Sequence, residues 1–128
     1  RIDLPNQVFS RIHVVDISSA IINSFSGPAG VYNIADDLPS SQNQIVELGC
    51  EMMGLEPPAP ILPSDASLSN EARAFYSENR RVGNGKAKRL LNWKPQFPTY
   101  AAGLRDCMAM ASPSNTSAAP PAAKADHA

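Results

Sequence analysis

The 128-residue chain has few cysteines and almost no net charge, and each scarcity argues against a class of protein. Cys50 and Cys107 lack the Cys-x-x-Cys spacing of a metal or redox site, so we expect packed thiols in a reducing, cytoplasmic compartment. A formal net charge of −1 argues against nucleic acid and membrane surfaces as partners. No apolar run approaches the ~18 residues that a membrane-spanning helix needs.

The catalytic motifs of common α/β enzymes are also missing. None of the three tyrosines is followed four residues later by lysine, a pair that transfers protons because the lysine lowers the pKa of the phenol. Gly27 and Gly30 precede an expected strand, whereas a phosphate-binding turn places its glycines after one. The pair Asp36-Asp37 is typical of a surface turn rather than a metal site. We therefore predict no catalytic residue, no metal site and no cofactor bound by this chain alone.

Short expected strands alternate with expected helices. Extended segments are predicted over 1–5, 7–14, 30–34 and 80–82, and helices near 17–25, 42–53, 70–76, 86–91 and 100–110. The residues expected to cap helix N-termini are Asp16, Ser41 (paired with Gln44), Ser69 and Thr99. This alternation predicts a small α/β domain over residues 1–110. The composition of residues 111–128, rich in Ser, Pro and Ala, predicts a disordered tail.

The most specific motif lies near the end of the chain. Residues 86–95, KAKRLLNWKP, followed by Gly103-Leu104, resemble the ending of extended short-chain dehydrogenases/reductases of the NAD(P)-dependent epimerase/dehydratase type. The runs FSRIHV (9–14), FYSENRRV (75–82) and PTYAAGL (98–104) resemble motifs of a compact bacterial branch. The resemblance covers residues 1–110. It implies the small C-terminal, substrate-binding lobe of a Rossmann-type protein whose cofactor-binding half is absent from this chain.

The resemblance also implies four substrate-binding residues: Arg11, His13, Arg73 and Arg81. Arg11 and His13 belong to a strand that borders the substrate pocket in the family, although Phe9 replaces the arginine that contacts a diphosphate there. Arg73 falls where the second diphosphate-binding arginine sits, and a guanidinium grips phosphate or carboxylate through paired hydrogen bonds. Arg80 and Arg81 point to opposite faces of an expected strand, so at most one can face the pocket. The alternatives are a structural histidine and solvated arginines.

These features give an expectation for the intact protein. It would bind NAD or NADP and transfer hydride, while this chain would bind a small-molecule substrate, with nucleotide sugars among the candidates, and be inactive alone. The chain begins at Arg1 rather than methionine, which suggests a fragment or a processed product. Two alternatives stay open: a non-enzymatic interaction module and an NAD(P)-linked redox sensor. An isolated lobe should expose an apolar face and self-associate.

Overall fold

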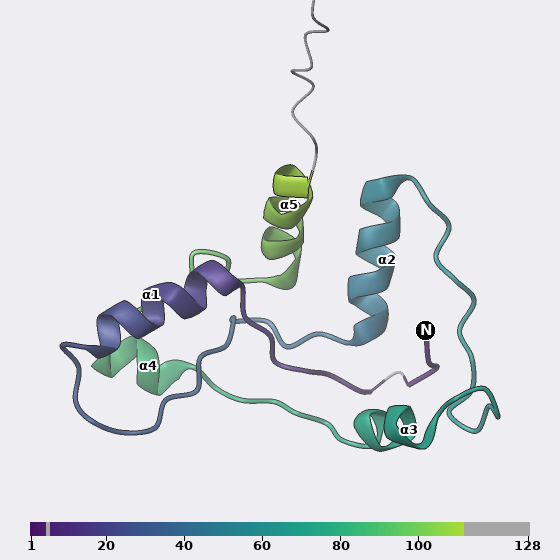
Figure 1. Ribbon diagram of the computed structural model, residues 1–128, viewed down its shortest axis with the longest axis horizontal. Coiled ribbons are helices and arrows are strands. Elements are labelled where there is room, and N and C mark those ends of the chain that lie inside the picture. The colour runs from purple at the N-terminus through teal and green to yellow at the C-terminus, as the bar shows by residue number, and fades with distance from the viewer. Residues whose placement is uncertain (5, 112–128) are drawn as a thin grey trace, which may run out of the picture.

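The computed structural model describes residues 1–4 and 6–111, and five helices make up the regular structure of that part (Figure 1). Two helices, α2 and α5, lie side by side, while α1 lies along α4 at one end of the molecule and α3 forms the opposite end. Their bounds are α1 Val14–Ser24, α2 Gln42–Met53, α3 Asn70–Tyr76, α4 Gly85–Leu90 and α5 Tyr100–Ala111. The predicted tail lies outside the described residues except for Ala111, which ends α5.

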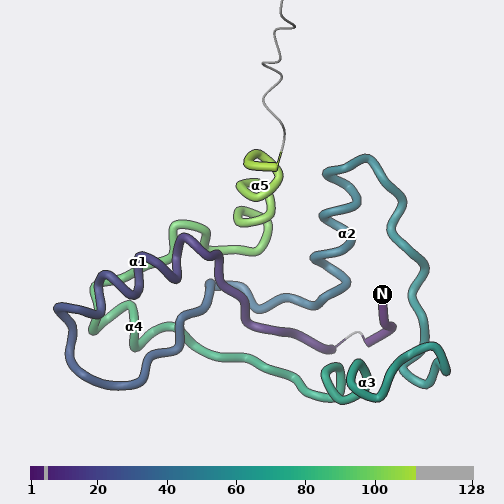
Figure 2. Tube along the Cα trace, viewed as in Figure 1, coloured from purple at the N-terminus to yellow at the C-terminus, as the bar shows by residue number. Residues whose placement is uncertain are grey.

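The predicted α/β class is wrong, because the described residues contain helices and no β-strand. Phe9 forms isolated bridges with Ser40 on one side and Arg80 on the other, where three segments run close together (Figure 2). Another bridge joins Ile2 to Ile61, and the predicted strand 30–34 forms none with any described residue. A strand persists only where a neighbour pairs along its length. These segments meet their neighbours at single positions, so they are extended without forming a sheet.

Most helix starts follow the predicted capping chemistry. The Ser41 hydroxyl accepts a hydrogen bond from the Gln44 N–H, and Gln44 Oε1 accepts one from the Ser41 N–H. This reciprocal pair confirms the capping box of α2. Ser69 caps α3, and Thr99 Oγ1 accepts from the N–H of Ala102 in the first turn of α5. The prediction for Asp16 is wrong. His13 occupies the N-cap of α1, and its Nδ1 accepts from the Val15 N–H.

Asp16 instead lies inside α1 and binds the segment between α4 and α5, residues 91–99, which we call the arm. Its side chain is 1% exposed, and its two oxygens accept the backbone N–H groups of Gln96 and Phe97 at 2.6 and 3.0 Å. Trp93, on the same arm, donates its indole N–H to Ser19 Oγ at 2.9 Å. A small core forms beneath these contacts, comprising Ala20, Ala87, Leu91 and Trp93.

The core is small for the apolar content of the chain. Among the described residues, eight hydrophobic residues are buried, whereas fifteen large hydrophobic residues are exposed. The exposed ones concentrate on α1, which contributes Val14, Val15, Ile17, Ile21 and Ile22, with Phe25 immediately after it. None of the helices in the described part is long and apolar enough to cross a membrane.

Candidate functional site

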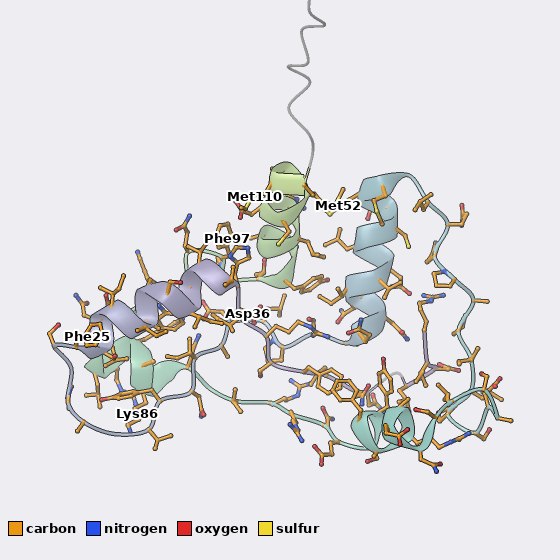
Figure 3. All side chains as sticks on the ribbon, viewed as in Figure 1. Phe25, Asp36, Met52, Lys86, Phe97 and Met110 are labelled. Atoms are coloured by element: carbon orange, nitrogen blue, oxygen red, sulfur yellow. The ribbon has the colours of Figure 1, made fainter. Side chains whose placement is uncertain are left out.

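A cavity of about 170 Å³ lies at the junction of α2, α5 and the segment that leads into α1; we call it the α2–α5 pocket. Its walls are mainly apolar, and Arg11, His13 and Asp36 are among its polar lining residues. Figure 3 places Asp36 near the centre of the molecule and Phe97, one of the wall residues, beside α5. The pocket therefore brings together two of the four predicted substrate-binding residues, Arg11 and His13. The other lining residues are Ile12, Ile45, Thr99, Tyr100, Gly103, Leu104 and Cys107.

Arg11 is held in one orientation by the loop before α2. Its Nη1 donates to the carbonyl and hydroxyl of Ser40 at 2.6 and 2.9 Å, and its Nη2 donates to Gln42 Oε1 at 3.0 Å. Burial lowers the pKa of Arg11, and the nearby Asp36 carboxylate opposes that shift. These bonds orient the guanidinium beside the pocket, and they also occupy much of its donor capacity.

His13 connects the start of α1 to α5. Because its Nδ1 accepts the Val15 N–H, the proton of the neutral ring lies on Nε2. That nitrogen lies 3.5 Å from Asp106 Oδ2 and 3.6 Å from the Cys107 sulfur. A protonated Nε2 cannot take a proton from the Cys107 thiol, so this pair is not arranged for nucleophilic catalysis. The imidazole packs against the Phe97 ring, with 4.2 Å between centroids.

Asp36 is the polar residue of the pocket that the sequence pattern assigned to a surface turn. It is 5% exposed, and burial raises the pKa of its carboxyl, against the effects of the Leu38 N–H and of Arg11. Its neighbour Asp37 does face outward and pairs with Lys88 at 2.6 Å. No local signal in the sequence separates these two aspartates, since what differs is the side of the loop that each occupies.

The other two predicted residues lie away from this pocket. Arg73 lines a separate cavity of about 230 Å³ that shares no lining residue with the α2–α5 pocket. Its guanidinium donates to the backbone carbonyls of Pro63 and Asp65, so it organises the loop before α3. Arg81 is exposed. No group of three or more His, Cys, Asp or Glu side chains in the described ranges could hold a metal ion.

Comparison with known proteins gives a similar solved structure. No protein-family model matches the chain, and no curated protein matches it. The solved structure of a functionally unknown conserved protein from Silicibacter pomeroyi is similar, with 39% sequence identity and a TM-score of 0.81. The match covers 86% of this chain and 40% of that protein. The chain thus spans about two-fifths of the length of a relative that has the same fold in this region.

Proposed function

We propose that this chain is the substrate-binding C-terminal half of a cytoplasmic NAD(P)-dependent epimerase/dehydratase-like oxidoreductase, and that it is inactive alone. The observation that carries the proposal is the meeting of Arg11 and His13 at one apolar pocket, since the family resemblance implicated both residues in substrate binding. The Silicibacter protein adds support, because 60% of its length lies outside the match and leaves room for a second half.

The pocket favours a compact substrate with limited charge. Drug-sized ligands occupy sites of roughly 300–1,000 Å³, so a 170 Å³ cavity accommodates only part of a nucleotide sugar. Phe9, at the position of a diphosphate-binding arginine in the family, is buried and stacks on Phe75 with 4.8 Å between ring centroids. Arg73 is committed to loop carbonyls. A small molecule with an apolar body and a hydrogen-bonding group that reaches Asp36 or Arg11 fits these walls better.

Nicotinamide fluorescence tests the proposal. The isolated chain, titrated into NADH and NADPH, should leave the emission of both unchanged. A chimera in which residues 1–111 replace the matched part of the Silicibacter protein should enhance or blue-shift the emission of one of them. Reduced-cofactor turnover by the isolated chain, or a folded chimera that binds neither cofactor, would overturn the proposal.

A pair of arginine variants separates the pocket from the remainder of the surface. In the chimera, Arg11→Lys keeps the charge but removes the paired hydrogen bonds to Ser40 and Gln42. Arg81→Lys changes an exposed arginine by the same chemistry and is the control. If the pocket holds substrate, a panel of small carbonyl compounds should be reduced at a different rate by the Arg11 variant only, while cofactor binding stays the same in both.

A further inference from the structure

The first helix, α1, turns its charged residue toward the core of this chain and its large apolar residues toward the outside. Asp16, the only charged residue of α1, is 1% exposed, and Ala20 is 3% exposed on the inward side. The large residues face out: Ile21 is 54%, Ile22 66% and Val14 68% exposed. Phe25, labelled in Figure 3 at the end of α1 remote from the pocket, is 85% exposed. A helix that borders water normally carries charged residues on its outer face, and the outer face of α1 has none.

A groove lies along this helix. It is lined by Ile17, Ala20 and Ile21 of α1, by Tyr32 and Ile34 of the segment after it, and by Leu91. Its volume is about 160 Å³ and its surface is almost wholly apolar. An aliphatic cavity of about this size accepts one benzene molecule, so the groove has room for one large apolar side chain. Val31, next to Tyr32 in the sequence, is 84% exposed and extends the apolar surface.

We propose that the outward face of α1 and this groove, together the α1 face, form the docking surface for the missing half of the protein. The occupant is the polypeptide equivalent to the 60% of the Silicibacter protein outside the match. It presents an uncharged apolar layer and inserts one aliphatic or aromatic side chain between Ile17, Ile21 and Leu91. The proposal rests on the proposed function only for the existence of a second half, and not for the cofactor that this half binds.

Two observations favour this occupant over a second copy of the chain. A relative with the same fold here carries additional polypeptide one and a half times as long as the matched part, and this polypeptide is covalently attached. The outer side of α1 also carries no charged residue, although Lys86 Nζ lies 4.8 Å from the Tyr32 ring centroid at the far edge of the groove. Both features are typical of a surface that is covered permanently.

Cysteine protection measures the covering directly. The reporter is Ile21→Cys, and the matched control is Leu62→Cys, an apolar residue 61% exposed on the connector between α2 and α3. Each is placed in the isolated chain and in the chimera, with Cys107→Ser in both because Cys107 is exposed. Maleimide labelling is followed by peptide mass spectrometry, which reads each position separately. We expect labelling at position 21 to be at least tenfold slower in the chimera, while position 62 changes less than twofold.

The other outcomes of this experiment are also decisive. Equal labelling of position 21 in the isolated chain and the chimera would overturn the proposal. Protection in the chimera that appears only as its concentration is raised would also overturn it, since the occupant would then be a second copy. If the chimera does not fold, the reporter cysteine is introduced at the position of the full-length Silicibacter protein that aligns with Ile21. Rapid labelling of that cysteine would again refute docking. Protection of position 21 without nicotinamide binding would support docking and reject the cofactor assignment. Nicotinamide binding without protection of position 21 would support the cofactor assignment and reject docking.

Discussion

The link between Asp16 and the arm after α4 gives the sharpest test of how the lobe is held together. Replacing Asp16 with alanine removes the acceptors for the backbone N–H groups of Gln96 and Phe97. A hydrogen bond to a charged group contributes about 1.5–3 kcal/mol. We take the low end for both bonds, because Gln96 is exposed and water can reach its N–H in the variant. Asp16→Ala should therefore lower the free energy of unfolding by about 3 kcal/mol.

Urea unfolding followed by tryptophan fluorescence measures this loss. Trp93 is the single tryptophan, is 3% exposed and lies on the same arm, so its emission reports the release of the arm. With a urea m-value of about 1–3 kcal/mol per molar, the expected loss lowers the midpoint by about 1–3 M. Asp16→Asn should fall between the wild type and the alanine variant, because the amide oxygen can still accept one N–H while its NH₂ group cannot accept the other.

The control and the contrary result are equally defined. Asp3 is exposed, so Asp3→Ala should change stability by less than about 0.5 kcal/mol. If Asp16→Ala lowers the free energy of unfolding no more than Asp3→Ala does, the buried carboxylate does not hold the arm, and the role assigned to Asp16 is wrong.

Three other perturbations follow from the same contacts. Burial raises the folded-state pKa of Asp36 above its unfolded value, so its contribution to stability is complete below the unfolded pKa and is lost as pH rises through the folded pKa. Asp36→Asn should therefore gain stability relative to the wild type as pH rises above about 4, the unfolded-state pKa of aspartate, in thermal melts at a series of pH values; a pH-independent difference would contradict this. A Cβ at Gly103 would lie 3.3 Å from His13 Cδ2, so Gly103→Val should cost about 1–3 kcal/mol, measured by urea midpoint. Trp93→Phe removes the bond to Ser19 and should cost about 1 kcal/mol by circular dichroism.

Helix starts could be read from the sequence because capping is local chemistry. Ser41 and Gln44 satisfy each other's backbone N–H groups within one turn, and no distant residue is needed for that pattern to form. Ser69 and Thr99 act in the same way. Aspartate is a common helix cap, but the carboxylate of Asp16 binds the N–H of Gln96, eighty residues away in the sequence. Local sequence patterns cannot reveal such a contact.

The predicted strands failed for a related reason. Whether an extended segment becomes a strand depends on the neighbour that pairs with it, and the sequence of the segment contains no information on whether that neighbour is present. Residues 30–34 have the β-branched and aromatic composition of a strand, but no described residue bridges to them. The prediction of strands from composition was wrong, because the described segments do not pair along their length.

The candidate site was predictable in part. Arg11 and His13 stand two positions apart in one short motif, so a single extended segment delivers both to the α2–α5 pocket. Arg73 was placed by counting along the chain, and the loop carbonyls that bind its guanidinium could not be foreseen from that count. Asp36 was missed because burial of one aspartate in a pair depends on how the loop packs, which only the folded chain determines.

The reversed polarity of α1 explains why the core of this lobe is so small. The inward side of the helix makes polar contacts rather than apolar ones: Asp16 binds the arm, and Ser19 accepts a hydrogen bond from the indole N–H of Trp93. Its large apolar residues are then left on the outer side, where a finished domain would expose charge. An exposed apolar face of this kind marks an interaction site. Docking of the proposed second half on the α1 face would cover these residues and complete the packing of α1 on both sides.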